Sequence, residues 1–347
     1  MKINAVDLFC GIGGLTHGVE KSGIKVLAGI DIDESCGFAY EENNKAKFIH
    51  KSIRDVTNQE LLDLYPEEGY KVLMGCAPCQ PFSSHNKNKY DRSQHKDWGL
   101  LYDFQNHVTQ LRPEIVSMEN VPALEKEEIF KEFVKSLKDN GYFVTYEVVN
   151  APDYGVPQRR KRLLLLASLF GEINFIPPTH ENNHVTVRDA IGHLPKIKAG
   201  ETDKVDYLHR SSSLNAINIE RIKFSKPGGT WRDWPEEILP ACYRRESGQT
   251  YTSVYGRMEW DEVSPTLTTQ FIRYGTGRYG HPEQNRALSL REGAILQTFP
   301  DDYKLVQDEK YNITNISKQI GNAVPVILGE VIGESIKRHL EDVENER

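Results

Sequence analysis

A cysteine lies where it could act as a nucleophile. Cys79 follows an apolar run, residues 72–75, that is typical of a buried strand, and Pro78 and Pro81 restrict the loop around it. A thiolate held in this way can attack an electrophilic carbon if it is accessible. Cys76 and Cys79 also form a Cys-x-x-Cys pair, a spacing found in thiol–disulfide oxidoreductases and in half of a zinc site. The cysteine alone therefore leaves covalent catalysis, redox chemistry and zinc binding open.

Charged side chains flank two further apolar segments. Glu119 stands at the end of one of them, where its carboxyl group could act as a general acid or contact a base edge. The basic cluster 158–162 immediately precedes the other, and strand alternation would place Arg160 and Arg162 on one face. Taken separately, a solvated or helix-capping glutamate and a solvated charge run are the alternatives.

A glycine-rich turn follows the first apolar segment. Gly11, Gly13 and Gly14 would let a ligand approach the backbone at the start of a helix. Thr16 occupies the position of the third glycine of the dinucleotide fingerprint, which weakens a pyrophosphate-binding interpretation. Asp31 ends the second apolar segment and could accept hydrogen bonds from a ribose. The pattern favours a nucleoside without phosphates, such as S-adenosylmethionine, and a turn that serves packing alone is the alternative.

Apolar and amphipathic segments alternate through the first half of the chain. Strands are predicted over residues 3–9, 24–30, 72–76, 115–118, 142–149 and 163–167, and helices over 15–21, 35–43, 100–111, 126–138 and 325–340. This alternation predicts an α/β fold with a doubly wound, mostly parallel, Rossmann-like sheet, in which ligands bind beyond the carboxyl ends of the strands. From about 196 to 260 the periodicity fades into sequence rich in Gly, Pro, Ser and aromatic residues, so a smaller, irregular domain is expected there.

Composition limits the classes of protein. A chain of 347 residues with 38% hydrophobic content can bury a large core, and five sparsely spread cysteines argue for a reducing cytoplasm. The N-terminus does not resemble a signal peptide, and the longest apolar stretch, residues 163–170, is too short for a bilayer. The net charge of -7 speaks mildly against nucleic acid, but residues 196–286 hold 14 Lys and Arg against 12 Asp and Glu. A cytoplasmic protein without membrane contact or metal is expected, with its middle segment best suited to nucleic acid.

Six sequence blocks, taken together and in order, resemble those of the DNA cytosine-C5 methyltransferase family, of the bacterial restriction–modification type. They are DLFCGIGG (7–14), PCQ (78–80), ENV (119–121), QRRKR (158–162), RALSLRE (286–292) and QIGNAVP (319–325). The resemblance covers nearly everything outside about 196–260. Cys10 stands where the family more often has Ala or Ser, and Ile32 stands where an aromatic residue often stacks on adenine. The second departure is expected to loosen adenine binding.

The resemblance implies covalent catalysis at cytosine. C5 of cytosine becomes nucleophilic enough to accept a methyl group once a thiolate has added to C6. By resemblance Cys79 supplies the thiolate and Glu119 donates to N3, while Arg160 and Arg162 hold the cytosine O2 and the reaction centre. Ordered water is expected to remove the C5 proton. The cofactor implied is S-adenosylmethionine, and the residues expected to bind it are Phe9, Gly11, Ile12, Gly13, Gly14, Asp31, Ile32, Asp55, Val56, Pro78, Leu100, Asn322 and Ala323.

The resemblance also implies double-stranded DNA as the partner, with the target cytosine flipped out of the stack. Residues 84–98 match the family's loop that closes over DNA. Residues 196–311 match the family's target-recognition domain and hinge, which the resemblance implies to be small, irregular and β-rich. Residues 1–195 with 312–347 match the catalytic, cofactor-binding domain. The expected DNA-binding residues are Ser84, His85, Lys87, Arg232, Arg244, Arg245, Arg257, Thr266 and Arg273. A monomer paired functionally with a restriction endonuclease of the same specificity is expected.

Three alternatives compete with this interpretation. A nicotinamide-dependent oxidoreductase would share the sheet and the glycine turn, but Thr16 breaks its fingerprint. A thiol redox protein would use Cys76 with Cys79, yet it needs neither the block 119–121 nor the arginine cluster. A tRNA-methylating branch also exists within the resemblance. Its characteristic Cys-Phe-Thr tripeptide is absent from the sequence, which favours DNA.

Overall fold

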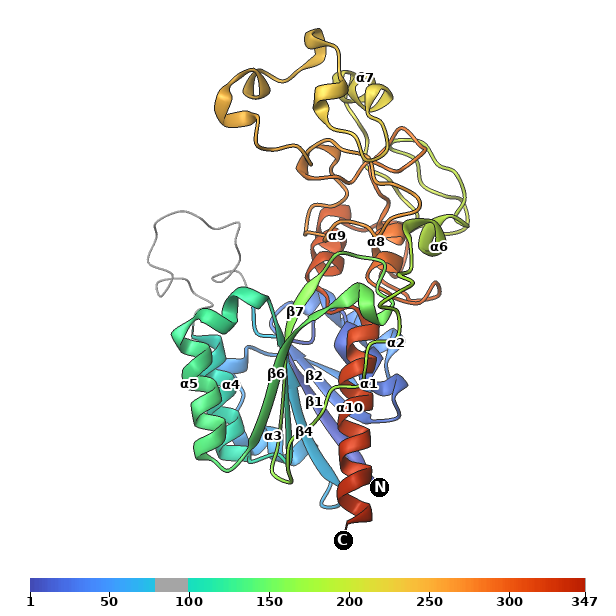
Figure 1. The fold of residues 1–347 in the computed structure, drawn as a ribbon. Helices are drawn as coiled ribbons and strands as arrows, with labels where there is room; N and C mark the ends of the chain where they lie inside the picture. The colour runs from blue at the N-terminus through green and yellow to red at the C-terminus, as the bar shows by residue number, and fades with distance from the viewer. Residues whose placement is uncertain (79–98, 347) are drawn as a thin grey trace. The chain divides into compact units, whose positions relative to one another are not determined.

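The chain divides into two compact units in a computed structural model that describes residues 1–78 and 99–346 (Figure 1). Unit 1 contains residues 1–154, 161–179 and the segment from 323 to the C-terminus, and unit 2 contains residues 155–160 and 180–322. The predicted boundaries at 195 and 311 both fall inside unit 2. They differ from this division because two helices just outside those boundaries, α6 (Val187–Ile191) and α9 (Ile313–Asn322), each pack on α8 (Leu290–Leu296) within unit 2.

Unit 1 is built on a seven-stranded sheet in the order β3-β2-β1-β4-β5-β7-β6. The first five strands in this order are parallel, and β7 runs antiparallel to both β5 and β6. The strands are β1 (Ile3–Leu8), β2 (Lys25–Asp31), β3 (Lys47–His50), β4 (Tyr70–Gly75), β5 (Ile115–Asn120), β6 (Phe143–Asn150) and β7 (Lys161–Ser168). The predicted α/β fold with a mostly parallel sheet is confirmed. The short strand β3 was not predicted, because its two apolar residues, Phe48 and Ile49, stand between the polar residues Lys47 and His50 and form no longer apolar run.

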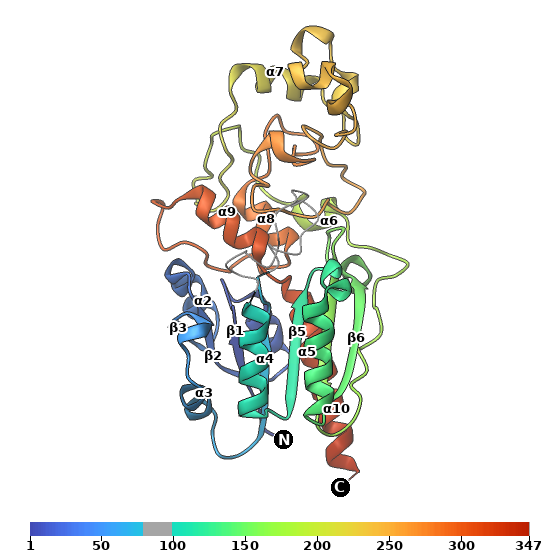
Figure 2. The ribbon, with the colours of Figure 1, turned by 90° about the vertical axis from the view of Figure 1, so that its left-hand side faces the viewer.

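Helices cover both faces of this sheet, α3, α4 and α5 on one and α1 and α10 on the other (Figures 1 and 2). The helices of unit 1 are α1 (Gly14–Lys21), α2 (Gly37–Asn43), α3 (Asn58–Leu64), α4 (Leu100–Leu111), α5 (Glu128–Asp139) and α10 (Val326–Asn345). α1 and α10 cross very closely, since a Cβ atom at Gly18 would lie 2.1 Å from the Val326 carbonyl oxygen. In residues 1–78 and 99–346 no helix has both the length and the apolar character needed to cross a bilayer.

Unit 2 is irregular. Its helices are α6 (Val187–Ile191), α7 (Ala216–Phe224), α8 (Leu290–Leu296) and α9 (Ile313–Asn322). The prediction of a β-rich domain is wrong, because in the described residues of this unit extended segments form isolated bridges and no multi-residue strand. Aromatic packing takes the place of a sheet: Trp231 stacks on Tyr243 with 4.6 Å between ring centroids, and Trp234 and Tyr274 complete the buried cluster.

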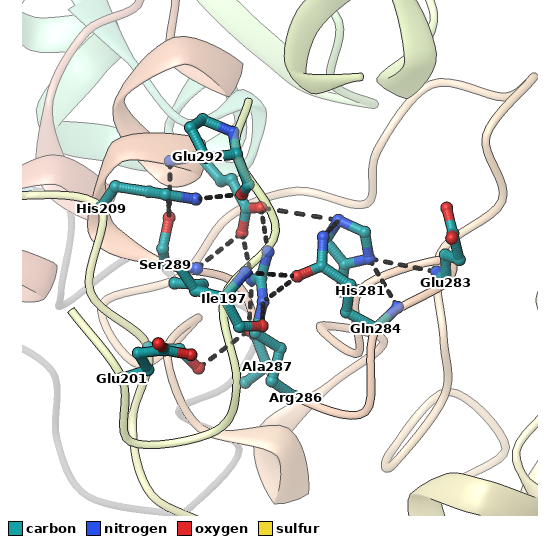
Figure 3. Close-up of polar contacts among 12 residues, drawn as sticks. Ile197, Glu201, His209, His281, Glu283, Gln284, Arg286, Ala287, Ser289 and Glu292 are labelled. Atoms are coloured by element: carbon teal, nitrogen blue, oxygen red, sulfur yellow. Dashed lines mark hydrogen bonds and ion pairs between the residues drawn. The ribbon is translucent and has the colours of Figure 1, made fainter. Parts of the chain in front are cut away.

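A buried charged network organises the part of unit 2 that precedes α8 (Figure 3). The Arg286 guanidinium donates to both carboxylate oxygens of Glu292, at 2.7 and 2.6 Å, and both side chains are fully buried. Ser289 caps α8 in a box with Glu292, and His209 contacts the Ser289 hydroxyl at 2.8 Å. Burial by itself would raise the pKa of Glu292, but the bonds and charge of Arg286 outweigh it and lower that pKa to about 2.

Candidate active site and cofactor site

Residues from separate sequence blocks lie at one edge of the unit 1 sheet. β1, β2, β4 and β5 are parallel and therefore end at the same edge. Asp31 is the last residue of β2, Cys76 follows β4, and Glu119 is the penultimate residue of β5. β7 runs in the opposite direction, so Arg162 near its start lies at this edge as well. The topology brings together residues that are far apart in the sequence.

The turn after β1 leaves room for a ligand. Gly11 and Gly13 have φ angles of +50° and +84°, a region that glycine adopts readily, and a Cβ at Gly11 would meet nothing within 4 Å. The Gly11 N–H donates to Asp31 Oδ2 at 2.8 Å, and the Asp33 N–H donates to Oδ1 at 2.9 Å. Each carboxylate oxygen keeps a further lone pair, so Asp31 can still accept ribose hydroxyls. Ile32 beside it is 69% exposed and offers an apolar surface to a flat ring.

Around this turn the backbone is held tightly. Phe9 has a φ angle of +62°, unusual for a residue other than glycine, and its N–H donates to the Ile30 carbonyl at 2.8 Å. Ile12 is buried, and Gly14 begins α1. Such strained, well-anchored backbone is common at binding sites.

Thr16 stabilises the region of the turn through buried hydrogen bonds. Its hydroxyl donates to Asp7 Oδ2 at 2.7 Å and lies 2.9 Å from the Tyr40 hydroxyl, and all three side chains are buried. Burial raises the pKa of Asp7 to about 7, against the lowering effect of the Thr16 bond. The residue that breaks the dinucleotide fingerprint therefore has a structural role of its own. Sequence analysis did not assign any role to Asp7 or Tyr40.

The segment 53–56 of unit 1 is anchored to α4. It contains Asp55, which is exposed, and Val56, which is buried. His107 Nε2 lies 3.2 Å from the Ile53 carbonyl oxygen, and Arg54 pairs with Asp103 at 3.0 Å. Leu100, half-buried, is the first residue of the same helix. Three predicted cofactor-binding residues, Asp55, Val56 and Leu100, therefore lie on α4 or on the segment anchored to it.

Other predicted site residues lie at element ends or outside the described part of the chain. Pro78 is half-buried and is the last residue before the gap. Asn322 ends α9 in unit 2, and Ala323 begins the last segment of unit 1. Four predicted residues lie outside the described residues: Cys79, Ser84, His85 and Lys87.

Glu119 is buried and held by two side chains of unit 1. Arg162 Nε lies 2.8 Å from its Oε1, with the arginine side chain 13% and the glutamate 2% exposed. The Cys76 thiol donates to its Oε2 at 2.7 Å. The neighbouring Asn120 donates to the Ala77 carbonyl at 3.0 Å and so ties β5 to the segment that leads to Cys79.

Arg160 belongs to unit 2, since the division falls between it and Lys161. It is buried, and its Nη1 lies 3.4 Å from Gln158 Oε1. Gln158 also accepts the Leu267 N–H at 2.9 Å and donates to Gln297 at 3.0 Å. Thr266, which is exposed, donates to the Arg159 carbonyl. Unit 2 therefore brings the predicted Thr266 beside the arginine cluster, through a glutamine whose role sequence analysis did not identify.

The predicted DNA-binding arginines of unit 2 differ in exposure. Arg232, Arg244, Arg245 and Arg273 are exposed. Arg257 is buried, and its guanidinium donates to the carbonyl oxygens of Ile222, Ser225, His281 and Gln284. A guanidinium occupied in this way cannot reach a phosphate, so the DNA-binding prediction for Arg257 does not fit the structure.

Comparison with known proteins extends these observations. Residues 3–338 match the model of the family described as C-5 cytosine-specific DNA methylase. The chain is 52% identical to the Type II methylase M.HgiDII of Herpetosiphon aurantiacus, over 97% of this chain and 95% of that protein. It is 32% identical to the Type II methyltransferase M1.HphI of Haemophilus parahaemolyticus, over 97% of this chain and 87% of that protein.

Solved structures share the fold. A prophage-encoded candidate DNA modification methyltransferase of Escherichia coli superposes with a TM-score of 0.72 at 21% identity, over 98% of this chain and all of that one. The Entamoeba histolytica methyltransferase EhMeth superposes with a TM-score of 0.66 at 17% identity, over 98% and 99% of the two chains.

The glycine turn with its open space, the Asp31 carboxylate and the exposed Ile32 fit S-adenosylmethionine, the methyl donor of this family. Residues 3–338 of this chain match the family model, and one relative is 52% identical. The chain therefore belongs to the C-5 cytosine-specific DNA methylases.

Proposed function

We propose that this enzyme methylates C5 of one cytosine within a specific double-stranded DNA sequence, with Cys79 as nucleophile and Glu119 as the acid at the base. The observation that carries the proposal is the placement of Glu119. It is a buried carboxyl group at the sheet edge, paired with Arg162, and the loop that leads to Cys79 leaves the neighbouring strand beside it.

The proposed chemistry assigns each residue one task. The Cys79 thiolate adds to C6 of a flipped cytosine, and Glu119 protonates or hydrogen-bonds N3 as negative charge develops on the ring. The bound S-adenosylmethionine supplies the methyl group to C5. Transfer of the C5 proton to ordered water, with breaking of the bond between C6 and the Cys79 sulfur, restores the aromatic ring and the free thiolate. Arg162 keeps the carboxyl group of Glu119 in place throughout.

A covalent trap tests the nucleophile. A duplex with 5-fluorocytosine at the target should form a stable adduct on Cys79, since fluorine cannot leave as the proton does. Cys79→Ser should form no adduct and transfer no methyl group while still binding DNA, because an alcohol is hardly ionised at neutral pH. An adduct mapped by mass spectrometry to another residue would remove Cys79 from this role.

For unit 2 we propose target recognition, supported by exposed arginines beside aromatic side chains. The segment 180–322 of a family member with a different target should carry its specificity into a chimera. Junctions at 180 and 322 keep the packing of α6, α8 and α9 intact. Bisulfite sequencing of DNA from cells that express the chimera should show the donor's site. If the chimera folds and methylates the original site, recognition lies elsewhere.

The names of two relatives support a proposal about partners and location. M.HgiDII and M1.HphI are named as Type II enzymes of bacteria. By extension we propose a monomer that works in the cytoplasm and protects DNA from a restriction endonuclease of the same specificity. Plasmid DNA from expressing cells should resist one endonuclease that cuts at the mapped site. Gel filtration with light scattering should give the mass of one chain, 39.6 kDa.

A further inference from the structure

The register of two strands places a cysteine beside the proposed acid. β4 and β5 are parallel, with Met74 opposite Ser117 and Gly75 opposite Met118. One step further along, Cys76 stands opposite Glu119. Residues opposite each other on neighbouring parallel strands project to the same face, which explains why these two side chains meet.

The backbone holds this cysteine firmly. Its N–H donates to the Leu8 carbonyl of β1 at 3.3 Å, so the end of β4 is tied to the neighbouring strand. At Gly75, just before it, a Cβ atom would lie 2.7 Å from the same Leu8 carbonyl oxygen. These contacts with β1 hold the backbone from which the Cys76 side chain reaches Glu119 on β5.

The two contacts of Glu119 fall on different oxygens. Arg162 Nε is 2.8 Å from Oε1, and the Cys76 thiol donates to Oε2 at 2.7 Å. With a neighbour fixed on each oxygen, the carboxyl plane cannot rotate about its last torsion without breaking a contact. The contact at Oε1 is an ion pair without hydrogen-bond geometry, so the Cys76 thiol supplies the hydrogen bond that a buried carboxyl group needs where water does not reach it.

From this arrangement we propose that Cys76 is a positioning residue, whose thiol orients Glu119 for its contact with the cytosine ring. The inference rests on the proposed role of Glu119. It gives the first cysteine of the Cys-x-x-Cys pair a task that involves no oxidation, since a thiol that donates a hydrogen bond to a carboxyl oxygen keeps its S–H bond. No electron transfer or bond formation at Cys76 is required.

Steady-state kinetics on a duplex with the mapped site tests the proposal. Loss of one buried hydrogen bond corresponds to about a tenfold effect, so Cys76→Ala should lower kcat about tenfold with KM for DNA nearly unchanged. Cys76→Ser keeps a donor and should recover most of kcat. Cys242→Ala, at an exposed cysteine of unit 2, is the matched control and should behave as the unmodified enzyme.

A double-mutant cycle separates this proposal from the role of Glu119. If Cys76 acts through Glu119, the variant Cys76→Ala/Glu119→Gln should be no slower than Glu119→Gln alone. Full kcat in Cys76→Ala together with impaired Glu119→Gln would overturn the positioning role and leave the acid in place. Full kcat in Glu119→Gln would overturn both. If Cys76→Ala unfolds at a lower temperature, the proposal is tested by comparing kcat of Cys76→Ser with kcat of the unmodified enzyme. A Ser variant as slow as Glu119→Gln would count against the proposal.

Discussion

Arg286 and Glu292 form a bidentate ion pair in which neither side chain is reached by solvent. The pair lies at the start of α8, where Glu292 also accepts the Ser289 N–H at 2.7 Å. Arg286 further donates to the Ile197 carbonyl at 3.2 Å, so one guanidinium joins segments 89 residues apart within unit 2. The block RALSLRE therefore holds distant segments of unit 2 together.

Removing the arginine should destabilise unit 2 strongly. Arg286→Met leaves a buried carboxylate without its partner, which costs about 3–5 kcal/mol. Urea unfolding, followed by the fluorescence of Trp231, Trp234 and Trp260, measures the loss. The double variant Arg286→Met/Glu292→Met should lose less than the single one. Equal stability of Arg286→Met and the unmodified protein would show that the pair contributes nothing.

Unit 2 should lose stability in acid. Burial lowers the pKa of His281 from 6.5 to about 4, so the stability gained from its neutral form is complete above pH 6.5 and lost as pH falls to 4. Arg286 lowers the pKa of Glu292 from 4.5 to about 2 despite burial, so its contribution, about 3 kcal/mol, is lost between those values as pH falls. The raised pKa of Asp7 in unit 1 acts in the opposite direction, losing stability as pH rises from 3.8 to 7.

The contribution of Glu292 to this pH dependence is measured by comparing the free energy of unfolding of Glu292→Gln with that of the unmodified protein. Glu292→Gln should be less stable at pH 7, and its free energy of unfolding should depend less on pH below 4.5 than that of the unmodified protein. Parallel curves for the two proteins in this range would contradict the assignment.

Two arginines of unit 2 should respond in different ways. Arg257→Ala should lower the melting temperature, because it strands buried carbonyl oxygens at a cost of about 3 kcal/mol or more. Arg245→Ala should leave melting unchanged but weaken DNA binding and reduce its salt dependence by about one unit of slope, as expected for a phosphate contact. Thermal melting measures the stability of both variants, and fluorescence anisotropy at several salt concentrations measures their DNA affinity. Lys135→Ala on α5 is the control. Unchanged DNA affinity in Arg245→Ala would rule out that contact.

Cofactor binding should depend on Asp31. Asp31→Ala removes an acceptor for the ribose and also frees the Gly11 N–H, so the Kd for S-adenosylmethionine should rise about tenfold or more. Asp31→Asn keeps one oxygen and should lose less. Glu68→Ala, an exposed carboxylate that precedes β4, serves as the control in isothermal titration. If Asp31→Ala binds as tightly as this control, the ribose lies elsewhere.

The sequence by itself determined the fold of unit 1 and the order of its motifs. Apolar runs such as 115–118 and the amphipathic helix 100–111 are local patterns, so their periodicity predicts them directly. Glu119 ends one such run and Asp31 ends another, and parallel strands carry their last residues to one edge of the sheet. That logic predicted the placement of Glu119 and Asp31, whereas Arg162, at the start of its strand, lies at the same edge because β7 runs antiparallel.

Tertiary structure alone decided which side chains meet and which are buried. Cys76 contacts Glu119 because of the register between β4 and β5, and Gln158 joins Leu267 across 109 residues, relationships that no local pattern contains. Arg257 and Arg245 look alike in a polar, aromatic-rich segment, yet one is enclosed by carbonyl oxygens and the other is exposed. Burial depends on chain segments packed from elsewhere, whereas a sequence pattern records only its neighbours along the chain.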